Sequence, residues 1–149
     1  MPAPATMENS RLQYWEHFAH GADIGVRGVA PSLAGAFEQA ALALTAVVTE
    51  PAGLNHDELV EVACEAPDLE LLLVDWLNAL IYEMVTRRLV FRRFEVRLDG
   101  GQLRAMAWGQ SIESPGIELA VEPKGATYTA LHVGQRPDGH WVAQCVVDV

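Results

Sequence analysis

The stretch LELLLVDWLNALIYEMVTRR, residues 69–88, carries the longest helical periodicity in the chain. Asp68 precedes it as a strong N-cap candidate, and its last residues, Arg87 and Arg88, lie where the helix dipole favours cations. Apolar residues cover most of the circumference, and the polar residues form one narrow stripe, which consists of Asp75, Asn78, Tyr82 and Thr86. The pattern predicts a long helix that is largely buried.

A second helix and a series of short strands are predicted around this one. Ser32 is an N-cap for a helix that ends near residues 49–51, and the small residues Ala36, Ala40 and Ala43 indicate close packing of this helix on a sheet. Alternating apolar residues predict the strands, at 14–20, 24–29, 59–65, 94–98, 103–108, 117–122, 127–133 and 140–149. The expected fold is α+β, with two helices packed on a largely antiparallel or mixed β-sheet in a single two-layer domain over 14–149, after a disordered N-terminal lead over 1–13.

Composition narrows the classes of function. The chain has 149 residues, with 20 acidic against 10 basic side chains and a net charge of -10, which disfavours nonspecific binding of nucleic acid over the whole surface. Cys64 and Cys145 are too far apart for a C-x-x-C pair, so neither a zinc site nor a disulfide framework is indicated, and a cytoplasmic location is expected. The start of the chain does not have the pattern of a signal peptide, and the polar residues within 69–85 exclude that run as a membrane span.

The segment HGADIG, residues 20–25, is a candidate site between two of the predicted strands. Gly21 and Gly25 allow a turn or a close backbone approach, so His20 and Asp23 would be presented at the end of a strand. The alternative is that both side chains only hydrogen-bond the local backbone.

Two further positions could supply chemistry. Asp148 and the carboxylate of Val149 are adjacent; beside Asp23, they would offer oxygen ligands to a hard cation such as calcium or magnesium. The alternative is a frayed, solvated terminus. Lys124 lies in a break between two predicted strands, where it is either aimed at a ligand or simply a solubilising group. The chain contains no P-loop, H-E-x-x-H, G-x-S-x-G or dinucleotide-binding turn.

Several segments together resemble the archease family over nearly the whole chain from Tyr14. These segments are HGADIG at 20–25, S-L-x3-F at 32–37, LLLV-x-WLN at 71–78, KGATY at 124–128 and WVAQ-x3-DV at 141–149. The resemblance implies a small, non-catalytic protein cofactor that activates a GTP-dependent RNA ligase in tRNA splicing and RNA repair, by promoting ligase guanylylation and multiple turnover. RNA and GTP would be met only through the ligase, without a membrane.

The resemblance also implies roles for particular residues. Asp23, Asp148 and Val149 map onto a divalent metal site, for which calcium is the first candidate and magnesium or manganese the others. Lys124 maps onto the lysine of the family's K-A-x-T-Y-like segment, and Lys124 and His20 are expected to contact the partner or its nucleotide. The chain departs from the family pattern at Gly21, where threonine is usual, and at 108–110, where WGQ replaces an Arg-Gly-Glu-like stretch.

Two other classes of function remain open from the sequence. One is a metal-dependent hydrolase in which His20 acts as general base. The other is a chaperone-like protein-binding module, supported by the broad apolar surface of the helix over 69–88.

Overall fold

Helix α3 (Leu69–Arg87) forms as its sequence predicts. The Asp68 carboxylate accepts a hydrogen bond from the Leu71 amide at 2.8 Å, which satisfies one of the free donors of the first turn. Arg88 ends the helix in a left-handed conformation with φ of 55°. All four residues of the predicted polar stripe are exposed and the apolar face is buried.

Helix α2 (Leu33–Val48) is also confirmed, with Ser32 as its N-cap. The Ser32 hydroxyl accepts from the Gly35 amide at 3.0 Å, and Thr49 closes the other end. The helix is buried around most of its circumference because it packs against strands on two sides.

The computed structural model describes residues 12–149 and arranges the strands in two antiparallel sheets. Sheet A has the order β1-β2-β8-β6, with β7 also paired to β8; its strands are β1 (Tyr14–His20), β2 (Asp23–Ala30), β6 (Gly125–Ala126), β7 (His132–Gln135) and β8 (Trp141–Asp148). Sheet B has the order β3-β5-β4; its strands are β3 (Glu58–Glu65), β4 (Leu89–Asp99) and β5 (Gln102–Ser111). A short 3-10 helix, η1 (Pro51–Gly53), follows α2.

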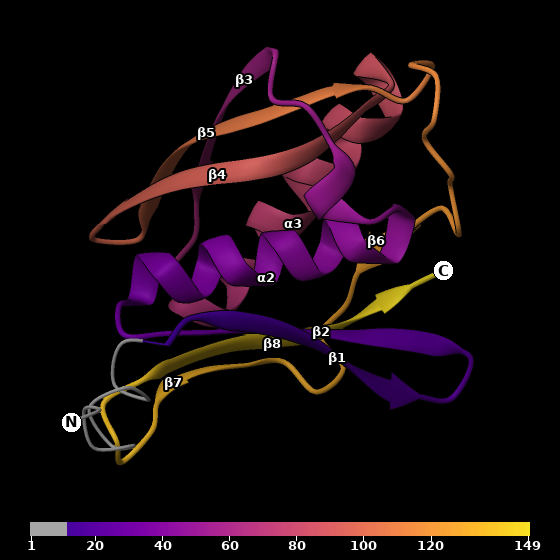
Figure 1. Cartoon of the computed structure of the whole chain (residues 1–149). Coiled ribbons are helices and arrows are strands. Elements are labelled where there is room, and N and C mark those ends of the chain that lie inside the picture. The colour runs from indigo at the N-terminus through magenta and orange to yellow at the C-terminus, as the bar shows by residue number, and fades with distance from the viewer. Residues whose placement is uncertain (1–11) are drawn as a thin grey trace, which may run out of the picture.

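The two helices form a layer between the sheets (Figure 1), since each helix contacts strands of both. The α+β class and the antiparallel pairing are confirmed. The strands, however, divide into two sheets instead of forming one. The physical reason is that α2 and α3 are apolar around so much of their surface that one sheet cannot cover them.

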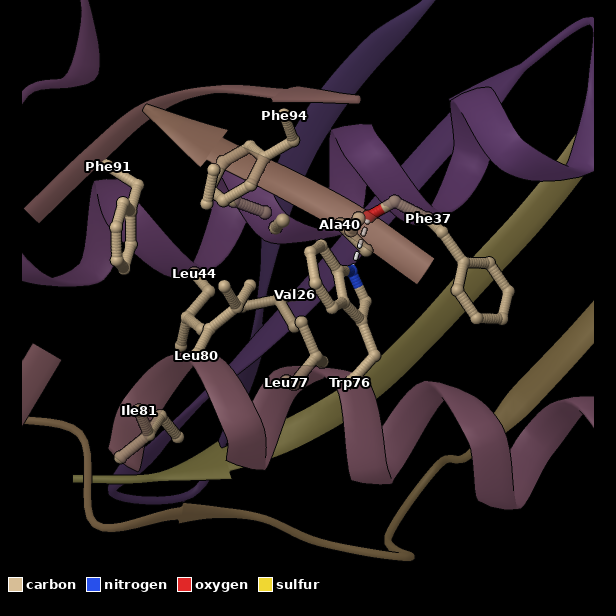
Figure 2. Close-up of a cluster of buried hydrophobic side chains, with 14 of the residues drawn as sticks. Val26, Phe37, Ala40, Leu44, Trp76, Leu77, Leu80, Ile81, Phe91 and Phe94 are labelled. Carbon is tan, nitrogen blue, oxygen red and sulfur yellow. Dashed lines mark hydrogen bonds between the residues drawn. The ribbon is translucent and has the colours of Figure 1, made fainter. Parts of the chain in front are cut away.

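The indole of Trp76 lies at the centre of the helix layer (Figure 2). It is fully buried, and its Nε1 donates a hydrogen bond to the carbonyl oxygen of Phe37 on α2 at 3.1 Å. Its ring meets Phe94 of β4 edge to face, with 5.9 Å between ring centroids. One side chain thus joins α3, α2 and sheet B.

Helix α2 lies directly on strand β2, as its alanines predict. A Cβ added to Gly28 would come within 2.2 Å of the Ala36 carbonyl oxygen and 2.3 Å of the Ala40 amide nitrogen. Backbone therefore contacts backbone at this crossing, and only glycine fits.

Two predicted strands near the end of the chain are wrong. Residues 117–122 form no strand, because the Ala120 amide donates to the Val48 carbonyl at the end of α2, at 2.7 Å, and not to a neighbouring strand. The single strand expected over 127–133 is interrupted by a turn in which Ala130 has φ of 53°, and pairing occurs on either side of it as β6 and β7.

The remaining expectations concern the N-terminal lead, membrane spans and the two cysteines. The lead expected over 1–13 falls almost entirely outside the described residues. Within residues 12–149, no helix combines the length and the apolar composition needed to cross a membrane. Cys64 in β3 and Cys145 in β8 are free thiols, and burial raises their pKa values to about 11 and about 12.

Replacing Gly28 with alanine is expected to destabilise the protein by about 1–3 kcal/mol, because the added methyl group must push α2 away from β2. Urea unfolding of the variant measures this change. Gly53→Ala is the matched control, since a Cβ at Gly53 meets nothing within 4 Å, and it should leave the unfolding midpoint nearly unchanged. Equal midpoints for the two variants would contradict the close approach.

Glu38 makes part of the stability dependent on pH. Its carboxylate on α2 accepts from the Val96 amide of β4 at 2.8 Å. Burial raises the pKa of Glu38 above its ordinary value, the Val96 hydrogen bond opposes this rise, and the charge of Glu95 adds to it. The pKa of Glu38 is higher in the folded protein than in the unfolded chain, so its protonation favours the folded state. This contribution of Glu38 to stability is complete below the unfolded pKa and is lost as pH rises through the folded pKa.

Glu38→Gln keeps an acceptor for the Val96 amide and removes the half-buried charge. The variant is expected to have a higher Tm than the wild type at pH 7, with the difference shrinking toward about pH 4. Thermal unfolding at a series of pH values tests this expectation. A Tm difference that does not change with pH would show that the Glu38 charge has no such effect.

Candidate functional site

The β1–β2 hairpin presents His20 and Asp23 on either side of a two-residue turn. The two residues are the last pair of the β1–β2 ladder, and Gly21 adopts a left-handed φ of 60°. A glycine at the first central position suits a tight hairpin turn, whereas a β-branched residue with positive φ would be strained. Glycine at position 21, where the family usually has threonine, therefore suits the positive φ of the turn that this chain forms.

The end of β8 lies beside this hairpin. Ile24 pairs with Val147, which brings Asp23 level with Asp148, and the Val149 amide donates to the Asp23 carboxylate at 3.3 Å. Figure 1 shows the end of β8 on the same side of the molecule as the β1–β2 turn. The pairing of the last strand beside Asp23, on which the predicted metal site depended, is present.

Lys124 lies at the same end of sheet A, on the other side of β8 from Asp23. Its amide donates to the Asp148 carbonyl at 2.8 Å, and the next residue, Gly125, pairs with Asp148. We call the surface formed by Asp23, Lys124, Asp148 and Val149 the sheet A tip. The structure thus brings together four of the five predicted site residues and leaves His20 at the turn beside them.

The charged groups of the sheet A tip are not neutralised within the described part of the chain. Over residues 12–149, neither Asp23, Asp148 nor Lys124 forms an ion pair. Asp148 and Lys124 are exposed, and Asp23 is half-buried. Within the same residues, no group of three or more His, Cys, Asp or Glu side chains is arranged to hold a metal ion. Any cation here would need main-chain oxygens as well as the two carboxylates.

The His20 side chain is exposed. In the part of the chain that the structure describes, it makes no hydrogen bond and no ion pair. Its backbone pairing with Asp23 positions the turn, and no hydrogen bond from residues 12–149 fixes the orientation or tautomer of its ring.

Asn78 was predicted as part of the polar stripe of α3 and of the family-like segment at 71–78, but not as a site residue, yet it holds the segment that carries Lys124. Its Oδ1 accepts from the Ala126 amide at 2.8 Å, and its Nδ2 donates to the Ala126 carbonyl at 3.4 Å. The side-chain amide thus bonds β6 as a neighbouring strand would. Asn78 is the one side-chain amide in the sequence of α3, which was the available signal, but its partner lies 48 positions away.

An apolar hollow of about 290 Å³ adjoins the segment before Lys124. It lies between the end of α3 and residues 119–123, and Val85 and Leu119 on its rim are about half exposed. Apolar surface is therefore available next to the charged tip.

The other departure, at 108–110, lies in sheet B and not at the tip. Trp108 lies beneath the Arg93 guanidinium, 4.6 Å from the ring centroid. Gln110 is buried and accepts a hydrogen bond from the Asn55 amide. A Cβ on Gly109 would lie 1.9 Å from the Val90 carbonyl oxygen, so this glycine is required by packing.

Comparison with known proteins identifies relatives over nearly the full length. The model of the Archease protein family (MTH1598/TM1083) matches residues 15–149. "Protein archease" of Pyrococcus abyssi is 39% identical over 142 residues, which are 93% of this chain and 100% of that protein. "Protein archease" of Methanosarcina barkeri is 34% identical over 146 residues, which are 95% of this chain and 99% of that protein.

Solved structures have the same fold. The solution structure of Methanobacterium thermoautotrophicum protein 1598 superposes with a TM-score of 0.77 at 28% identity, covering 91% of this chain and 98% of that one. A crystal structure from Thermotoga maritima, described as an archease and possible chaperone, superposes with a TM-score of 0.55 at 20% identity, covering 90% and 96%. The resemblance seen in the sequence is confirmed: the chain belongs to the archease family.

Proposed function

We propose that the protein is a non-catalytic cofactor that activates a GTP-dependent RNA ligase of tRNA splicing or RNA repair. It would promote transfer of GMP from GTP to the ligase and thereby allow multiple turnover. Family membership supports the proposal. The observation that carries it is the sheet A tip, where Asp23 bonds a residue 126 positions away and Lys124 is tied to the same strand end.

The residues of the tip fit a divalent cation that prefers oxygen ligands. Two carboxylates, Asp23 and Asp148, lie level with each other on neighbouring strands and have no cationic partner within the described residues. Together with the main-chain oxygens of Val149 they offer only oxygen donors, which suits calcium first and magnesium or manganese next. When bound, such an ion would supply positive charge toward phosphate oxygens of a ligand.

The chain's own residues would prepare this tip. Asp23, by accepting from the Val149 amide, holds the end of β8 against the hairpin. The Asp148 carbonyl and the Asn78 amide fix the backbone around Lys124, so that the exposed ammonium group is free to contact a phosphate or an acidic group of the ligase. His20 lies beside this surface as a second group for the partner or its nucleotide.

The net charge of -10 supports contact with RNA through the ligase and not directly. A cytoplasmic location goes with that partner and is part of the proposal. A hydrolase has less support, because a general base at His20 would need a neighbour to orient its ring.

A general protein-binding role is the second candidate. It is favoured by exposed aromatic and aliphatic side chains near the tip, since Tyr82 is 65% exposed, Val85 52% and Tyr128 69%. Suppression of aggregation of unrelated client proteins, without any effect on the ligase, would favour this role over ligase activation.

Metal binding can be measured without the ligase. Asp23→Asn combined with Asp148→Asn removes two charges and leaves an oxygen at position 23 for the Val149 amide. The affinity for calcium in isothermal titration calorimetry is expected to fall by at least about tenfold. Asp57→Asn, in an exposed loop, is the matched control and should bind as the wild type does. Equal affinities for all three proteins would exclude the tip as the metal site.

Ligase activation is tested with purified ligase, GTP and an RNA substrate. The wild-type protein is expected to accelerate formation of GMP-ligase and to permit repeated joining. Lys124→Ala is expected to reduce this acceleration by about tenfold or more, because a charge-assisted contact is lost.

Arg87→Ala, which removes an exposed cation at the end of α3, is the control and should activate normally. Equal guanylylation and equal multiple turnover with and without the protein would reject the proposal.

A further inference from the structure

The outer face of sheet B carries rows of alternating charge. The residues that alternate with the buried ones on β3, β5 and β4 point away from the helices, and the strand register aligns them in rows across the sheet. The two middle rows are Glu61, Met106, Glu95 and then Ala63, Arg104, Arg97. The first is acidic and the second is basic.

The flanking rows continue the alternation. They are Leu59, Trp108, Arg93 on one side and Glu65, Gln102, Asp99 on the other. Along the strands the four rows therefore read basic, acidic, basic, acidic.

These charges are poorly satisfied within one molecule. Arg97 and Arg104 lie directly opposite each other on β4 and β5, and like charges at such positions destabilise a sheet. Arg97 approaches Glu95 only at 3.8 Å, with its side chain 81% exposed. Within residues 12–149, Arg104 and Glu61 form no ion pair.

We propose that this face binds the same face of a second copy of the chain. The two-fold axis would run parallel to the rows, between the two middle ones. Rotation about this axis reverses the order of the rows in the second copy. Every acidic row of one copy therefore faces a basic row of the other. Arg97 then faces Glu95 of the partner subunit, and Arg93 faces Asp99 of the partner subunit. Such a self-complementary contact is what a two-fold dimer requires.

Other arrangements and ligands fit this face less well. An axis parallel to the strands would set each row against its own copy and oppose like charges. A nucleic acid would meet three arginines but also four carboxylates on the same face.

Shape and side-chain type support the second copy. A hollow of about 550 Å³ lined by the middle rows gives room for the long side chains of the partner's Arg97 and Arg104. Trp108, with Arg93 stacked on it, and Met106 are residue types that are enriched at protein interfaces.

The size of the face predicts a weak dimer. Four rows of three residues fall below the roughly 20–30 residues per side of a standard interface. We expect a Kd on the order of micromolar and a strong dependence on salt, because exposed charges are screened. The sheet A tip belongs to the other sheet and stays free in both copies (Figure 1).

Sedimentation velocity of the full chain over a range of concentrations tests the dimer. At low ionic strength a monomer–dimer equilibrium is expected, and raising the salt to about 1 M should shift it to monomer. A monomer at every concentration at low salt would overturn the proposal, as would a dimer that salt does not affect.

Charge reversal identifies the face. Arg97→Glu with Arg104→Glu should be monomeric alone, and so should Glu61→Arg with Glu95→Arg. An equimolar mixture of the two variants should form a heterodimer, since their middle rows are then wholly acidic and wholly basic. Arg87→Glu with Arg88→Glu is the control of equal charge change, at the end of α3, and should dimerise as the wild type does.

Homodimers in both reversed variants would place the interface elsewhere and overturn the proposal. A mixture that remains monomeric would do the same, provided that circular dichroism shows both variants folded. If one reversed variant fails to fold, the other still decides the question, since a homodimer of that folded variant would overturn the proposal.

Discussion

The buried hydrogen bond from the Trp76 indole to the Phe37 carbonyl fixes the relative position of the two helices. It joins them where neither contacts water, so its loss would leave a buried donor without a partner. Sheet A is built on α2 through the glycine crossing at Gly28, and sheet B is attached to the same helix through Glu38 and Val96. The relation between the two sheets therefore depends on how α2 and α3 are held.

The position of β8 brings the residues of the candidate site together. β8 lies between β2 on one side and β6 and β7 on the other, so its end meets the hairpin and the Lys124 segment at once. Each contact at the sheet A tip uses a main-chain group of β8 or of its neighbours. The side chains of Asp148 and Lys124 are consequently left exposed and available for a ligand.

Much of this arrangement could be predicted from the sequence, because local patterns determine local structure. Ser32 and Asp68 marked the two helix starts, and the alternation over residues 14–29 and 94–108 marked two hairpins. The grouping of Asp23, Asp148 and Lys124 came from the family resemblance together with the strand pattern at the end of the chain. Alternation shows that a strand has one buried face but not which strand it pairs with, so the division into two sheets was not predictable.

The remaining errors have the same origin. Residues 117–122 alternate as a strand does, but their backbone bonds the end of α2. The contact of Asn78 with Ala126 joins a helix to a strand through a side chain, which no periodicity records.

The pairing of β2 with β8 also affects the order in which the two sheets form during folding. The two strands are joined by bonds between residues such as Arg27 and Gln144, 117 positions apart, whereas β3, β4 and β5 lie within one continuous part of the chain. Long-range pairing of this kind forms slowly, because a large loop must close before the contacts repay its entropy. All three strands of sheet B precede residues 141–148 in the chain, whereas the sheet A tip cannot assemble until those residues have been synthesised. A molecule that recognises the whole sheet A tip therefore recognises only chains in which β8 has already paired with β2.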